Sequence, residues 1–289
     1  MATSKHTIPL PNTVPGLSQA AFDRLFAKVG KHLPKVKPSG RPRAFDNHQV
    51  LWLTLQHLYC GIDLSDIALR EGVTPRCVQI WVGKCIDIIE QHVLPVLPDG
   101  TTIRSPKQVL NWVAACGNEA LIDGTEFGIE RAADKENPGY SYGEAQKEYY
   151  SGKAHGHTLK AQVVSDHDAN LLDVSGLVPG SIHDYTIFKD SRWFRLLKDC
   201  VVGVDRAYTG IEETHPEARV PYKKPKGGQL TKQQRAWNSK QASWRVFVEH
   251  AIAKLKQWKV VRRVKLRRRR LTTLVHLAFV LTTYRQAWP

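Results

Sequence analysis

Residues 244–260 read WRVFVEHAIAKLKQWKV, and this stretch decides the fold. Its apolar positions recur at the spacing of one helix face, Trp244, Phe247, Val248, Ala251, Leu255 and Trp258. At 100° per residue, Glu249 lies about 40° and Lys256 about 20° around the helix from Arg245. Glu249 is also the only acidic residue between Lys223 and Arg270, a segment with seventeen Lys and Arg. A solvated salt-bridge helix would intersperse its charges, so this pattern predicts a metal ligand next to a bound polyanion.

The composition favours a phosphate-rich partner. The chain has 289 residues, 42% of them hydrophobic, with a formal net charge of +15 and a pI near 9.7. Nucleic acid fits this charge better than a membrane does, because no stretch has eighteen consecutive apolar residues. Five cysteines without a C-x-x-C pair indicate reduced thiols. We therefore expect no membrane association. We expect the protein inside the cell, in the cytoplasm or nucleoid of a bacterium or in the nucleus of a eukaryote.

Four segments follow from the changes in pattern along the chain. We expect residues 1–43 to form a basic flexible N-terminal arm, and the pattern of residues 44–95 predicts helices. Residues 96–116 form a linker with a short helix. Residues 117–289 mix strands and helices: a strand over 120–131, a hairpin over 157–177 that turns at 166–170, an amphipathic helix over 181–198 and a short strand from Cys200. The fold class is therefore α+β, a mixed sheet flanked by helices after an all-α domain.

The helical segment 44–95 contains a helix-turn-helix pattern. Gly72 gives the first helix a left-handed exit, Thr74 caps the second, and Pro75 occupies its first turn. The second helix would present side chains suited to base edges and phosphates, Arg76, Gln79 and Lys84. An ordinary helical hairpin is the alternative interpretation.

Two carboxylates follow apolar strands. Asp123 comes after Ala-Leu-Ile, and Asp205 comes after Val-Val-Gly-Val. An acid in such a position is costly unless its charge is compensated. Asp123 could cap the turn at Gly124, and Asp205 could pair with Arg206. Acids at the ends of adjacent strands, joined by one from a helix, would instead bind hard cations through oxygen.

The ordered motifs LIDGTEFGIER, SGKAHGHTLKAQVV, VPGSIHD, VDRAYTG and WRVFVEHAIAKLKQWKV resemble the catalytic core of DDE transposases. The similarity is to the bacterial insertion-sequence group allied to Harbinger elements, and it covers residues 45–289. It implies a ribonuclease-H-like domain with Asp123, Asp205 and Glu249 as catalytic acids and ligands of two Mg²⁺ or Mn²⁺ ions.

The resemblance also implies a reaction and its partners. The enzyme would bind terminal inverted repeats, cut the strand and transfer its end into target DNA, with Arg245 and Lys256 positioning phosphate oxygens. A Tyr that often precedes the Arg is Ala242 here. Double-stranded DNA and a second copy of the chain are the expected partners. The alternatives are a transposase-derived DNA-binding protein without catalysis and a hydrolytic metal-dependent nuclease.

Residues near these motifs have two interpretations each. His183 and Asp184 could assist the site or cap the following helix. Lys153 and Lys160 could line a DNA channel or lie at solvated strand ends. We expect Glu126 at the surface.

Overall fold

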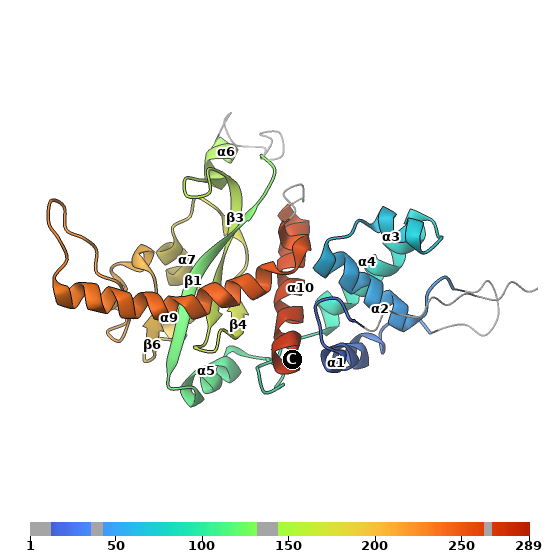
Figure 1. The fold of residues 1–289 in the computed structure, drawn as a ribbon, viewed down its shortest axis with the longest axis horizontal. Coiled ribbons are helices and arrows are strands. Elements are labelled where there is room, and N and C mark those ends of the chain that lie inside the picture. The colour runs from blue at the N-terminus through green and yellow to red at the C-terminus, as the bar shows by residue number, and fades with distance from the viewer. Residues whose placement is uncertain (1–12, 36–42, 132–143, 263–267) are drawn as a thin grey trace, which may run out of the picture. The chain divides into compact units, whose positions relative to one another are not determined.

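The computed structural model describes residues 13–35, 43–131, 144–262 and 268–289, and it shows two compact units (Figure 1). The first comprises Met1–Val93 with Trp288–Pro289, and the second comprises Leu94–Ala287. Within the described ranges, no helix combines the length and the apolar character needed to span a bilayer.

The first unit is helical. Its elements are α1 (Gln19–Val29), α2 (Asn47–Leu55) with a π-helical continuation (Gln56–Cys60), α3 (Leu64–Arg70) and α4 (Pro75–His92). Helix α1 lies inside the segment expected to be a flexible arm. It forms because Ser18 caps its first turn and because Phe22 and Leu25 are buried in the unit. The remainder of that arm, residues 1–12 and 36–42, lies outside the described residues.

The junction of α3 and α4 follows the predicted turn chemistry. Gly72 has a φ of +63°, and the backbone N–H of Val73 donates to Ala68 O to close the end of α3. The Thr74 hydroxyl accepts the N–H of Cys77 at 3.3 Å, with Pro75 at the first helical position.

The second unit is built on a mixed sheet. Its central strand β1 (Glu119–Gly128) pairs antiparallel with β3 (Gly156–Ser165) and parallel with β6 (Val201–Gly203). The other edge of β3 pairs with three short strands, β2 (Tyr150–Ser151), β5 (Val178–Pro179) and β4 (Leu171–Val174). The predicted hairpin is confirmed, because Asp166 accepts the N–H groups of Asp168 and Asn170 in the turn between β3 and β4.

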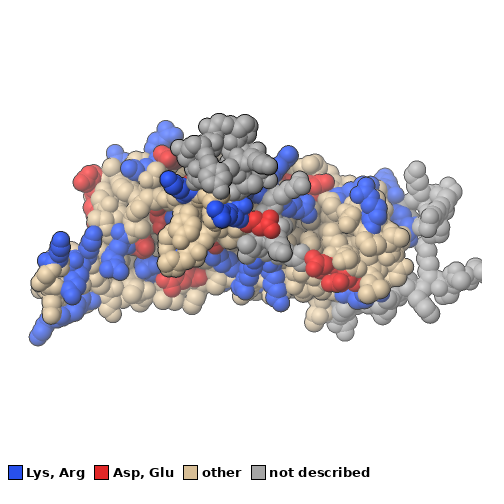
Figure 2. Space-filling model, turned by 90° about the horizontal axis from the view of Figure 1, so that it is seen from above, with Lys and Arg blue, Asp and Glu red and all other residues tan. Residues whose placement is uncertain are grey.

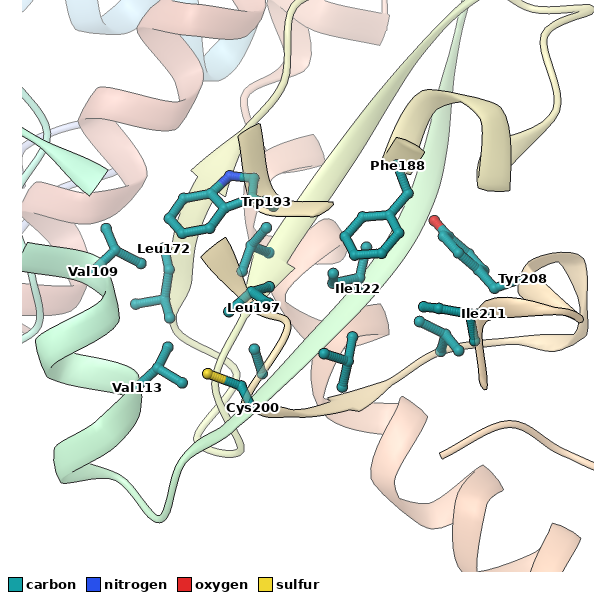
Figure 3. Packing of buried hydrophobic residues seen from close by; sticks show 14 of the residues in the cluster. Val109, Val113, Ile122, Leu172, Phe188, Trp193, Leu197, Cys200, Tyr208 and Ile211 are labelled. Atoms are coloured by element: carbon teal, nitrogen blue, oxygen red, sulfur yellow. The ribbon is translucent and has the colours of Figure 1, made fainter. Parts of the chain in front are cut away.

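Helices cover both faces of this sheet. One face carries α5 (Pro106–Ala115), α7 (Asp184–Asp190) and α8 (Arg192–Leu196), whose apolar side chains enclose a core with Ile122 of β1 (Figure 3). The long helix α9 (Lys232–Lys256) crosses the other face and packs against α10 (Arg268–Ala287) (Figure 1). The remaining elements are short, α6 (Glu144–Tyr149) and 3₁₀ turns over Arg206–Tyr208, Ile211–Glu213 and Lys259–Arg262.

The helix predicted over 181–198 is interrupted. Ser191 has an extended backbone, with φ −81° and ψ 155°, and its hydroxyl donates to Phe188 O. A serine that hydrogen-bonds locally in this way ends α7 and starts α8, so the segment folds as two short helices.

Candidate active site

Asp123 lies in the interior of the central strand. β1 runs on for five more residues, to Gly128, as the strand expected over 120–131 implies, so the expectation of an acid at a strand end is wrong for Asp123. Its neighbour Ile122 belongs to the core, and successive side chains of a strand point to opposite faces. Asp123 therefore faces α9, with only 12% of its side chain exposed. Its Oδ1 accepts the N–H of Gly124 at 2.8 Å.

Asp205 occupies the matching position beside β6. The parallel register pairs Leu121 with Gly203, and each acid lies two residues beyond one member of that pair. The two acids are near neighbours, and the charge of Asp205 acts on the Asp123 carboxyl, raising its pKa. Oδ1 of Asp205 accepts the N–H of Ala207 at 2.7 Å and caps the following 3₁₀ turn.

The third acid, Glu249, lies on α9, and Arg245 of the same helix links it to Asp123. Nη2 of Arg245 lies 3.5 Å from Oδ2 of Asp123 and 3.4 Å from Oε1 of Glu249. Glu249 is 54% exposed, whereas Asp123 is 12% exposed. Arg245 and Glu249 lie on the same side of α9, as their helical spacing predicted, and the guanidinium bridges a buried and an exposed carboxylate, which the spacing alone did not predict.

The electrostatics of Asp123 reflect this setting. Burial raises the pKa of its carboxyl above the ordinary value. The Arg245 guanidinium opposes this, Asp205 raises the pKa further, and the Gly124 N–H and Lys153 lower it. A further positive charge next to this carboxylate would therefore stabilise its ionised form.

Two comparisons with known proteins now bear on the site. A family model described as DDE superfamily endonuclease matches residues 122–283, more than half of the chain. A probable transposase for insertion sequence element IS702 from Microchaete diplosiphon is 30% identical over 249 residues, which cover 85% of this chain and 83% of that protein. The chain belongs to the DDE transposase family. It is a DNA-cleaving enzyme.

Two solved structures also match this chain, at low sequence identity. A Mos1 transposase paired-end complex with the left transposon end is 11% identical, covering 79% of this chain and 83% of that one, with a TM-score of 0.22. A pre-cleavage Mos1 transpososome is 10% identical, covering 81% and 83%, with a TM-score of 0.21. Such low TM-scores do not establish a common fold.

The donor chemistry of the transposase fits the divalent ions that its superfamily generally uses. Asp123 and Glu249 already share one cationic group, and carboxylate oxygens are the ligands that Mg²⁺ and Mn²⁺ prefer. Among the described residues, however, no three His, Cys, Asp or Glu side chains are arranged to hold one ion. The Arg245 guanidinium lies between Asp123 and Glu249, within 3.5 Å of an oxygen of each, which is where an ion shared by these two acids would lie.

Lys256 joins α9 to the central strand of the transposase. Its Nζ donates to Glu126 O at 2.9 Å and lies 5.4 Å from the centre of the Phe127 ring. Burial is the main reason that its pKa is lowered, and Lys153 lowers it further. Lys153 is exposed and acts on both Lys256 and Asp123, so its charge faces the site. Ala242, the departure from the family pattern, is also exposed.

Lys160 is buried in the interior of β3, so neither the DNA channel nor the solvated strand end considered from the sequence describes it. Its Nζ donates to Ile182 O at 2.9 Å and lies 2.9 Å from Oδ1 of Asp184, a contact that is ionic without hydrogen-bond alignment. Glu126, expected at the surface, is only 17% exposed and lies 3.9 Å from the same ammonium. These charges form an internal cluster because each compensates the burial of the others.

The two auxiliary candidates differ in their surroundings. His183 is exposed and holds the N-cap position of α7 without a capping side-chain bond. Asp184 begins α7 and lies against β1, where a Cβ on Gly124 would come within 2.7 Å of its Oδ1. Asp184 therefore lies directly beside the strand that carries Asp123.

The sequence analysis did not single out Tyr208, which lies close to the acids. It is fully buried, and its hydroxyl accepts a hydrogen bond from Nε2 of Gln162 at 3.0 Å. Burial raises its pKa well above the ordinary value, and the charges of Asp184, Asp123 and Asp205 raise it further. The signal was its place in the motif VDRAYTG, three residues after Asp205, in the 3₁₀ turn that Asp205 caps.

The helix-turn-helix candidates lie in the first unit. Arg76, Gln79 and Lys84 are all exposed on α4. Trp81, on the same helix, has the Lys84 ammonium 5.1 Å and the Arg43 guanidinium 3.9 Å from its ring centre. This helix therefore offers cations and an amide to solvent beside an aromatic ring.

Proposed function

We propose that this chain is a DNA transposase that binds terminal inverted repeats and catalyses two-metal cleavage and strand transfer. The observation that carries the proposal is the placement of Asp123 beside Asp205, with Arg245 linking Asp123 to Glu249. The sheet supports a ribonuclease-H-like domain over residues 117–289, because its antiparallel strands β4, β3 and β1 are followed by a parallel β6.

Asp123, Asp205 and Glu249 would hold two Mg²⁺ or Mn²⁺ ions. Bound there, the ions would supply activation of the attacking oxygen and charge neutralisation at the phosphate. The chain itself contributes cations to the same place. Arg245 and Lys153 would position non-bridging phosphate oxygens, and Lys256 would fix α9 against β1 while its charge adds to the field.

Recognition of transposon ends would belong to residues 44–95. The turn between α3 and α4 leaves Arg76, Gln79 and Lys84 exposed on one helix, as a recognition helix requires. Double-stranded DNA is then the partner of both units, at transposon ends and at the target. Bringing two ends together calls for self-association of the chain. Such a protein acts where the DNA is, in the nucleoid or the nucleus.

An assay on end-labelled inverted-repeat duplex with Mg²⁺ tests the proposal. We expect nicked strands and strand-transfer products from the wild type, and neither from Asp123→Asn. Nicks without transfer would favour a hydrolytic nuclease. A gel shift without any cutting would favour a DNA-binding protein that has lost catalysis.

A further inference from the structure

The first turns of α9 extend beyond the core of the second unit. None of the buried side chains of α9 precedes Gln241, although the helix begins at Lys232. The preceding loop folds back onto these turns. The Tyr222 N–H donates to Oδ1 of Asn238 at 2.7 Å, Nδ2 of Asn238 donates to Tyr222 O at 3.0 Å, and Nε1 of Trp237 donates to Val220 O at 3.1 Å. Residues 222–240, the basic extension, thus have a defined shape without a core.

The basic extension carries one sign of charge. It contains no Asp or Glu, and its six cations are all exposed: Lys223, Lys224, Lys226, Lys232, Arg235 and Lys240. Seen from above, Lys and Arg side chains gather at this end of the second unit, at the left of Figure 2. An unpaired group of like charges costs free energy through self-repulsion, so it indicates a polyanionic partner.

The extension is aligned with the candidate active site. Arg235, Ala242, Glu249 and Lys256 are spaced seven residues apart on α9, so they form one row that drifts by only about 20° per step. Arg235 and Ala242 are exposed, and the methyl group of Ala242 leaves room between the cation and the acid. A duplex whose reacting phosphate lies at Glu249 and which follows this row would next meet Arg235.

The helix gives the reach of this contact. Lys240 and Lys232 precede Glu249 by nine and seventeen residues. At 1.5 Å per residue they lie roughly 14 and 25 Å from it along the axis. At 3.4 Å per base pair, these distances correspond to about four and about seven to eight base pairs of duplex.

We propose that the basic extension binds the phosphate backbone of the duplex that leads away from the reacting phosphate, about four to eight base pairs from it, without reading base sequence. This inference rests on the proposed function and assigns a DNA contact separate from α4 and from the acids. A second copy of the chain is a poorer partner, because its own formal net charge is +15.

The test compares two variants of the full chain. Lys224→Gln/Lys226→Gln/Lys232→Gln/Arg235→Gln removes four of the six positive charges of the extension. Lys107→Gln/Lys189→Gln/Arg195→Gln/Lys198→Gln removes the same number of exposed charges from α5, α7 and the α8 region. Binding is measured by fluorescence anisotropy on inverted-repeat duplexes that extend 3 or 15 base pairs beyond the cleavage position, over a range of salt concentrations.

We expect the first variant to bind the long duplex roughly tenfold or more weakly, with a salt slope reduced by about 2 to 4, and to bind the short duplex like the wild type. The control should bind both like the wild type. Equal behaviour of the two variants overturns the proposal. So does a change in sedimentation of the first variant with unchanged DNA binding, which would assign the surface to a second copy.

The proposed function and this inference fail separately. A wild type that never cuts the repeat with Mg²⁺ contradicts the function, whatever the variants do. A wild type that cuts and transfers, while the extension variant matches it at both duplex lengths, contradicts only the extension.

Discussion

The guanidinium of Arg245 lies 3.5 Å from the carboxylate of Asp123, where it compensates a buried negative charge. In Arg245→Ala this charge loses its partner, so we expect the metal-free protein to lose about 1–2 kcal/mol of stability. Mg²⁺ should then raise the melting temperature of the variant more than that of the wild type, since no guanidinium has to be displaced. Thermal melts in Mg²⁺ and in EDTA measure this, with Arg195→Ala as the control. Equal Mg²⁺ shifts in all three proteins would show that Arg245 does not occupy the ion's place.

Asp123 predicts an inverted pH dependence of stability. Its pKa is raised in the folded state, so the folded protein binds this proton more tightly than the unfolded chain does. The contribution favours folding at low pH and is lost as the pH rises through the folded pKa. We expect metal-free Asp123→Asn to be more stable than the wild type at pH ~7, by a few degrees in melting temperature, with the gap closing toward pH ~4. Asp190→Asn, an exposed control, should show no such gap.

Glu249 should be needed for cutting but not for binding. It is exposed and forms an ion pair with Arg245, so we expect its loss to leave the fold and the DNA surface intact. We expect Glu249→Gln to lower Mg²⁺-dependent cleavage by roughly 10³-fold. Its affinity for inverted-repeat duplex in EDTA should stay within about twofold of the wild type, and Glu217→Gln should resemble the wild type in both assays. A parallel loss of binding and cleavage would remove Glu249 from the acids that act on the phosphate.

Lys160 and Lys153 should respond oppositely to the same change. Lys160→Met leaves Glu126 and Asp184 buried without their cation, so we expect a loss of about 3 kcal/mol in the free energy of unfolding and little change in DNA affinity. Lys153→Met should leave stability unchanged and weaken DNA binding, since this ammonium is exposed beside the acids. Urea denaturation and anisotropy at low salt measure the two effects. Adding Asp184→Asn should restore part of the stability that Lys160→Met removes.

Arg76 should carry sequence discrimination. It is exposed in the first turns of α4, where a recognition helix contacts base edges. We expect Arg76→Ala to lose about 1–3 kcal/mol of affinity for terminal repeats and none for unrelated duplex. Lys84→Ala should weaken both equally and lower the salt slope by about 1. Competition binding with the two duplexes separates these outcomes, and a uniform loss in Arg76→Ala would mean that α4 contacts phosphates alone.

Helical spacing predicted the relation of Arg245 to Glu249, since neighbours on one helix are fixed by rotation per residue. The hairpin and the turn at Gly72 followed equally from local chemistry. Lys160 did not, because its partners Glu126 and Asp184 come from segments that meet only when β3, β1 and α7 assemble. The strand expected over 120–131 already placed Asp123 in its interior, and the pairing of β1 with β3 as far as Gly128 agrees with it.

Helix α9 runs without interruption from Lys232 to Lys256, so Glu249 and the exposed Arg235 belong to one stiff rod. An unbroken helix has no hinge at which its two ends could move separately. DNA bound near Arg235 that tilts this end of α9 would therefore also shift the Glu249 carboxylate. The position of the bound duplex and the position of the acid would then change together.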